Sequence, residues 1–175
     1  FLESSGSVQL DGQPAVVDMA IPAIAKIVTG ADGHAVITLE PGAAVEVRKN
    51  TTVDIGRSEK KKVSLRLLAG ALWSFLPKGA SYEVSTLNAT AGVRGSAFYM
   101  EAKDPKDTYI CACDGDIDIE AANKKSFSKV VSSKMEHKAF RFLTKGKKQV
   151  AKKQPRLNHT DAEKDLLMPS MERAK

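Results

Sequence analysis

Residues 63–67 read Val63-Ser64-Leu65-Arg66-Leu67, an alternation of apolar and polar side chains. A period of two places successive side chains on opposite faces of a strand, so this stretch predicts a strand with one face in a core. The alternation recurs on either side of it, at Ala44-Val45-Glu46-Val47 and at Tyr82-Glu83-Val84-Ser85-Thr86. Because a helix would scatter these apolar side chains around its circumference, the pattern favours β-structure.

Short segments rich in Gly, Pro and Asp separate the alternating runs, and residues of these types favour turns. Examples are Ala31-Asp32-Gly33, Glu40-Pro41-Gly42, Pro77-Lys78-Gly79 and Asp104-Pro105-Lys106-Asp107. Turns about ten residues apart fit a sandwich, a barrel or a β-solenoid, and the period alone does not choose among them. We therefore expect residues 8–142 to be almost entirely β, with a body, residues 1–143, that closes its own core.

The positive charge of the chain is concentrated near its end. The formal net charge is +6, with 12 Lys/Arg and 16 Asp/Glu in residues 1–120 (−4) and 15 Lys/Arg and 5 Asp/Glu in residues 121–175 (+10). The densest basic stretch, residues 145–153, has no aromatic residue on which a base could stack, which argues against a nucleic-acid partner. We expect residues 144–175 to hold a solvated Lys-rich linker and a short helical extension.

The expected helix begins at Thr160-Asp161-Ala162-Glu163, which has the spacing of a capping box. Leu166 and Leu167 would supply its apolar side, and Pro169 would stop it.

Several classes of protein are disfavoured by what the sequence lacks. It has no run of eighteen apolar residues, so we expect no transmembrane segment in this chain, and the first residue is Phe1, so we expect that an upstream signal peptide or anchor was removed. Nucleophile-elbow, phosphate-loop, dinucleotide and metalloprotease motifs are absent, and the acidic row from Asp114 to Glu120 does not fit a calcium loop. We therefore expect a protein that is not an enzyme.

Three segments, read in order, resemble the FecR domain, and a fourth resembles its closing strands. The segments are Ile27–Leu39 with Gly42–Val47, Val63–Trp73, the strongest piece Tyr82–Phe98 with Val93-Arg94-Gly95-Ser96 at its centre, and Thr108–Ile119. Ser96 stands where the family usually has Thr. The resemblance covers about residues 8 to 120.

This resemblance implies an exported, periplasmic bacterial protein with a twisted β-sandwich or solenoid-like body. It also implies a binding and signalling module whose partner is another protein or the cell wall. Regulators of this family carry a cytoplasmic anti-sigma segment and a membrane helix upstream, and neither occurs in this sequence.

Cys111 and Cys113 are the sharpest local feature of the chain. Two cysteines are too few for a disulfide framework, and in a strand this pair lies on one face. Within the resemblance, the positions that face the core are Ile110 and Ala112. We therefore expect both thiols to point away from the main core, although buried free cysteine is the usual fate of this residue type.

Two thiols on one face can share a soft metal, and they need further ligands. His137 and His159 lie in the region that follows the FecR-like strands, and a fold-back of that region would complete a Cys₂His₂ set suited to zinc or copper. Such ligands would bind less well as pH falls, because protons compete for them. An alternative function is therefore a metal- or redox-handling protein built on the FecR scaffold.

Overall fold

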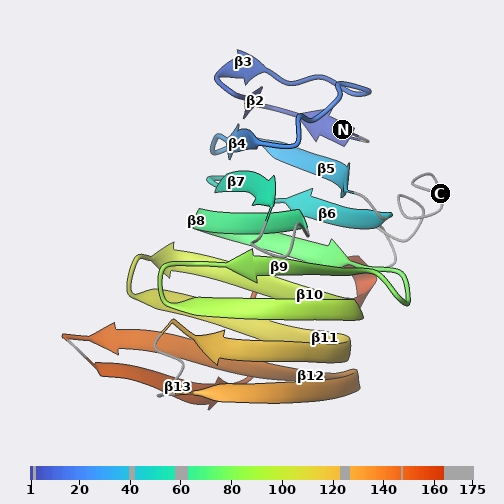
Figure 1. Ribbon diagram of the computed structural model, residues 1–175. Helices are drawn as coiled ribbons and strands as arrows, with labels where there is room; N and C mark the ends of the chain where they lie inside the picture. Colours follow the sequence, from blue (N-terminus) through green and yellow to red (C-terminus); the bar gives the residue numbers. More distant parts are fainter. Residues whose placement is uncertain (2, 40–41, 58–62, 123–126, 147, 164–175) are drawn as a thin grey trace.

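The chain forms one sheet of thirteen strands, as the computed structural model shows for residues 1–163 except 2, 40–41, 58–62, 123–126 and 147 (Figure 1). This confirms the expected all-β class. The strands are β1 (Glu3–Ser5), β2 (Val8–Leu10), β3 (Gln13–Pro14), β4 (Ala25–Thr29), β5 (His34–Leu39), β6 (Ala43–Val47), β7 (Thr52–Arg57), β8 (Val63–Phe75), β9 (Ser81–Ser85), β10 (Ala89–Asp104), β11 (Asp107–Ala121), β12 (Ser128–Lys145) and β13 (Lys148–Gln154).

The strands stack in a column, from β3 and β2 at one end to β12 and β13 at the other (Figure 1). Each of the four long strands, β8, β10, β11 and β12, is divided by a bend into two halves. The first half of β8 pairs with β7, while its second half pairs with β6 and β10. All pairings are antiparallel except that of β8 with β9. The long strands therefore bend across the column and close the core between their two halves.

The bend in β8 occurs at Gly70, whose φ is +85°. A Cβ atom at this position would lie 2.3 Å from Thr51 Oγ1 and 2.5 Å from Thr51 Cα, closer than van der Waals contact allows. Both the backbone conformation and the close approach therefore require glycine here.

Two apolar clusters lie on opposite faces of the long strands. The main core takes the side chains of Leu72, Met100 and Ile110, whereas a second cluster takes their neighbours in sequence. The second cluster comprises Val36, Ala71, Trp73, Phe75, Ala97, Tyr99, Tyr109, Cys111, Cys113 and Ala139, with Leu157 packed against it. The face that carries the two cysteines is thus a small core of its own.

The basic stretch that we expected to be a linker contains strand β13. Lys148–Gln154 pairs with Ala139–Lys145 in the second half of β12, so the expected boundary between residues 143 and 144 falls inside β12. The lysines did not prevent strand formation because an edge strand leaves long charged side chains in solvent, where they also discourage edge-to-edge association.

The capping box at Thr160 is confirmed. The Thr160 backbone N–H donates to Glu163 Oε2 at 2.6 Å, and the Glu163 N–H donates back to Thr160 Oγ1 at 3.4 Å. The described helix covers residues 161–163, while Leu166, Leu167 and Pro169 lie outside the described residues. No helix of the described residues has the length and apolar character that crossing a membrane would require.

Candidate metal centre

Strand β11 places both thiols on the face opposite the main core, as the register indicated. Ile110 and Ala112 lie in the main core, and Cys111 and Cys113 lie in the second cluster. Both thiols are buried, at 0% and 1% exposure, and Leu157 and His159 of the segment after β13 pack against this face. Both cysteines are free.

His137 reaches the thiols because β12 bulges opposite Cys113. Asp114 pairs with Lys134 and Ala112 pairs with Lys138, so a step of two residues on β11 faces a step of four on β12. Within the bulge, Met135 and His137 have φ of 61° and 53°, in the left-handed region that non-glycine residues rarely adopt. Bulges of this kind re-aim side chains, and this one turns His137 toward the second cluster.

Ser133 braces the bulge. Its hydroxyl donates to the backbone carbonyl of Cys113 at 3.2 Å and accepts the backbone N–H of Glu136 at 3.1 Å. The strained conformation of β12 is therefore tied directly to the strand that carries the thiols.

His159 comes from the segment that follows β13, residues 155–163, which we call the C-terminal strap. After β13 the chain runs back along the column (Figure 1), and Leu157 of the strap packs against the second cluster. The His159 ring is buried, stacks on Tyr99 with centroids 4.6 Å apart, and meets the Trp73 ring edge-on at 5.6 Å. Its sequence position alone would not have revealed this placement.

The structure brings all four predicted ligands together. Their ligand atoms, the Sγ atoms of Cys111 and Cys113 and one ring nitrogen each of His137 and His159, lie within 4.8 Å of one another. The two Sγ atoms are 3.9 Å apart, Cys111 Sγ lies 3.8 Å from His137 Nδ1, and Cys113 Sγ lies 3.4 Å from His159 Nε2.

These separations match a tetrahedral metal centre. With zinc–sulfur bonds of about 2.3 Å and zinc–nitrogen bonds of about 2.0 Å, the edges of a tetrahedron are about 3.3–3.8 Å. The three closest contacts, at 3.4–3.9 Å, already lie near these edges, and the widest separation in the set, up to 4.8 Å, would have to close by about 1 Å to complete the coordination. A disulfide would instead require the two Sγ atoms to approach to about 2.05 Å.

Hydrogen bonds on the far side of each imidazole orient its free nitrogen toward the thiols. His159 Nδ1 donates to the carbonyl of Leu157 at 2.7 Å, which leaves Nε2 to face Cys113. His137 Nε2 donates to the Asp161 carboxylate at 2.6 Å, which leaves Nδ1 to face Cys111. Carbonyl and carboxylate partners of this kind are typical of metal-ligating histidines.

The two thiols differ in acidity. A hydrogen bond from Cys113 lowers the pKa of Cys111 to about 5, with further help from His159 and His137 and against the effect of burial. The same hydrogen bond, together with burial, raises the pKa of Cys113 above its ordinary value. The pair therefore holds one thiolate near neutral pH, and a thiolate is the form that binds a metal.

Sequence reasoning missed the residues that support the ligands. Asp161 was assigned only to the capping box, although it also orients His137 and accepts a hydrogen bond from Arg156 at 3.0 Å. Arg48 lies over the rings of Trp73 and Tyr99, with its guanidinium 5.8 and 5.2 Å from their centroids. Nothing in their spacing connects these residues, because more than 100 positions separate Arg48 from the strap.

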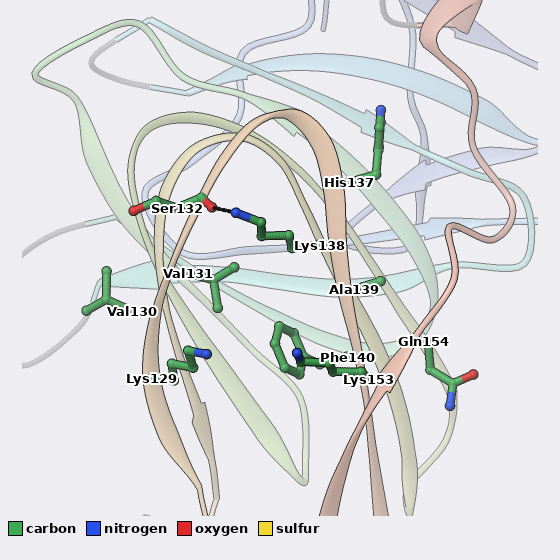
Figure 2. Close-up of a pocket in the computed structure, with 10 residues that line it drawn as sticks. All are labelled: Lys129, Val130, Val131, Ser132, His137, Lys138, Ala139, Phe140, Lys153 and Gln154. Carbon is green, nitrogen blue, oxygen red and sulfur yellow. Dashed lines mark hydrogen bonds between the residues drawn. The ribbon is translucent and has the colours of Figure 1, made fainter.

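A hollow of roughly 480 Å³ lies beside the centre, between the two halves of β12 and the end of β13. Its walls include Lys129, Val131, Phe140 and Lys153, and Lys138 Nζ donates to the Ser132 carbonyl at 2.7 Å across it (Figure 2). His137 stands at its rim, with its ring directed away from the other lining side chains in Figure 2. The hollow is therefore distinct from the place where the four ligand atoms meet.

The family model described as FecR protein matches residues 25–118, just over half of the chain. The matched region contains both cysteines and neither of the two clustered histidines. No curated protein matches the chain.

Two crystal structures, both described as "a putative anti-sigma factor from Parabacteroides distasonis ATCC 8503", are similar in fold. Their TM-scores are 0.60 and 0.56, at 13% and 14% sequence identity. The alignments cover 75% and 74% of this chain but only 60% and 59% of the solved chains, so this chain spans about three fifths of their length.

Proposed function

We propose that this chain, which belongs to the FecR protein family, is a non-enzymatic regulatory module of the periplasm that binds one transition-metal ion. The observation that carries the metal site is the convergence of Cys111, Cys113, His137 and His159, with all four ligand atoms within 4.8 Å. Three segments that are distant in sequence supply these ligands, and each imidazole already has a hydrogen-bond partner on its far side.

Zinc fits this ligand set better than copper. Two sulfur and two imidazole ligands in a tetrahedral arrangement are typical of zinc, and four protein ligands make a closed site of the structural kind. A closed site leaves no position for a substrate, which supports a role other than catalysis. A purely redox role is less well supported, because both thiols are buried and reactive cysteines are generally partly exposed.

Family membership and the printed description of the two similar structures support a regulatory role with a protein partner in preference to a cell-wall ligand. The sheet offers one place for such a partner. Among the described residues, Ser128–Lys134 of β12 pairs with β11 alone, whereas Ala139–Lys145 also pairs with β13. An open strand edge can accept a strand from another protein.

Metal content tests the centre. Protein purified from a periplasmic fraction should carry about one zinc ion per chain by elemental mass spectrometry, and the double variant Cys111→Ser with Cys113→Ser should carry none. His34→Gln is the matched control, since His34 lies outside the centre and bonds to Glu46. Equal metal content in the wild type and the double variant would exclude the centre.

Complementation tests the regulatory role. Deletion of the gene should change the abundance of a defined set of transcripts, and the wild type and His34→Gln should restore them. If the metal centre serves regulation, the double cysteine variant should not restore them at equal protein abundance. An unchanged transcript profile after deletion would reject the regulatory role.

A further inference from the structure

We propose that the ion acts as a latch that holds the C-terminal strap, residues 155–163, against the aromatic face of the sheet. This inference rests on the proposed metal centre and adds to it a function in regulation. With the ion bound, the strap covers Trp73, Tyr99 and Tyr109; without it, the strap opens.

The distribution of the ligands makes the ion a cross-link. Cys111 and Cys113 come from β11 and His137 from β12, two neighbouring strands joined by an extensive ladder. His159 comes from the strap, 46 residues after Cys113. Strands β11 and β12 are already paired, so an ion bound to all four ligands would hardly change how they are held together. Its main effect would be to join the strap to these two strands.

Apart from His159, the strap is held by hydrogen bonds and ion pairs that are exposed or only partly buried. Tyr109 Oη donates to the Pro155 carbonyl at 3.1 Å and accepts the Leu157 N–H, Arg48 pairs with Glu163 at 3.1 Å, and Asp161 accepts from His137 at 2.6 Å. Arg48 donates to the Asn158 carbonyl at 2.6 Å, and Asn158 Nδ2 donates to Glu101 at 2.6 Å, both in exposed positions. Leu157 is its only apolar side chain packed against the second cluster, and it is only partly buried. Exposed hydrogen bonds add little net stability, so His159 is the principal anchor.

The centre without an ion also provides a reason for the strap to open. His159 Nε2 then lies in a buried site 3.4 Å from Cys113 Sγ, and the Cys113 thiol is also within hydrogen-bond distance of Cys111 Sγ, at 3.9 Å. Thiols form weak hydrogen bonds, which replace the hydration of a buried imidazole poorly. Metal ligation removes this penalty, whereas opening of the strap returns the ring to water.

The chain contains two reporters of strap opening. The Leu157 backbone N–H donates to Tyr109 Oη at 2.9 Å, so its hydrogen exchange measures release of the strap. Trp73 is the single tryptophan of the sequence, is 1% exposed and contacts His159. Its emission should move to longer wavelength when water reaches the indole.

The experiment compares full-length protein loaded with zinc and the same protein after treatment with EDTA. Removal of zinc should accelerate exchange at the Leu157 amide at least about 100-fold and shift Trp73 emission to longer wavelength. Amides of the β4–β7 ladder, far from the centre, serve as the internal reference and should change little. Unchanged Leu157 exchange in protein from which zinc has been removed would overturn the latch.

Two substitutions of His159 separate ligation from ring stacking. His159→Cys keeps a metal ligand and loses the stack on Tyr99, so Leu157 exchange should remain dependent on zinc. His159→Phe keeps the stack and cannot bind the ion, so exchange should be fast with or without zinc. If the Phe variant protects Leu157 as well as zinc-loaded wild type does, stacking holds the strap and the latch is wrong.

Failure of the latch is distinguishable from failure of the centre. If the wild type binds no zinc, the proposed centre fails. If it binds one zinc per chain but EDTA leaves both Leu157 exchange and Trp73 emission unchanged, the centre stands and the latch alone is rejected.

Discussion

His159 Nε2 lies 3.4 Å from Cys113 Sγ, across 46 residues of sequence. The cysteine belongs to the region that matches the FecR family, and the histidine belongs to the strap that follows it. This contact exists because β13 pairs with β12 and directs the chain back toward the second cluster. The candidate centre therefore links the region that matches the FecR family to a segment outside that region.

Asp161→Asn should weaken zinc binding about 10–100-fold, because loss of the carboxylate removes the partner that orients His137. Competition with a chromogenic chelator measures the affinity. Glu136→Gln is the matched control, since this acidic residue lies in the same bulge as His137, is exposed and pairs with Lys138. Equal affinities for the two variants would show that Asp161 has no role in orienting the ligand.

Met135→Gly should stabilise the protein by up to about 1 kcal/mol. Met135 is exposed and has φ of 61°, a conformation that glycine adopts without steric cost. Val130→Gly, at an exposed position of the same strand without positive φ, should instead destabilise. Urea unfolding of the metal-free proteins measures both changes, and destabilisation by Met135→Gly would contradict the assigned strain.

Gly70→Ala should destabilise by about 3 kcal/mol or more, since the new Cβ would meet the backbone and hydroxyl of Thr51 as well as the strained φ. Gly79 has a similar φ of +87° but no atom within 4 Å of an added Cβ. Gly79→Ala should therefore lose only about 1–2 kcal/mol to backbone strain. Equal melting temperatures for the two variants would show that the contact with Thr51 relaxes freely.

The ion pair of Asp107 with Arg141 should make stability depend on pH in the acid range. Arg141 donates to both carboxylate oxygens, and this lowers the pKa of Asp107 below its ordinary value of 3.8. Because the pKa of Asp107 is lower in the folded state, the ion pair contributes its full stabilisation well above pH 3.8. This stabilisation is lost as pH falls through the folded-state pKa of Asp107.

Asp107→Asn should therefore lower the free energy of unfolding by about 1 kcal/mol at neutral pH and leave it unchanged at the lowest pH. Urea unfolding at a series of pH values measures this difference. Asp54→Asn is the control, because its pair with Lys26 is 3.7 Å long and both side chains are more exposed than that of Asp107. A cost for Asp107→Asn that did not change with pH would mean that packing, not charge, is lost.

The faces of the strands could be predicted from local sequence. A period of two put the two thiols on one face, the resemblance to the FecR domain assigned Ile110 and Ala112 to the main core, and the structure has the same arrangement. The capping box at Thr160 was also predictable, because its two hydrogen bonds join residues only three positions apart. These features depend on the backbone geometry of one segment and therefore need no knowledge of the rest of the chain.

The meeting of the four ligands was expected only on condition that the final segment folded back, and the sequence by itself contained no means of testing that condition. Only the tertiary structure decided that the Lys-rich stretch pairs as β13, that β12 bulges at His137, and that Asp161 orients its ring. The physical reason is that each of these features is stabilised by contacts between segments distant in sequence. Local propensity is neutral or unfavourable to them, as the positive φ of Met135 and His137 shows.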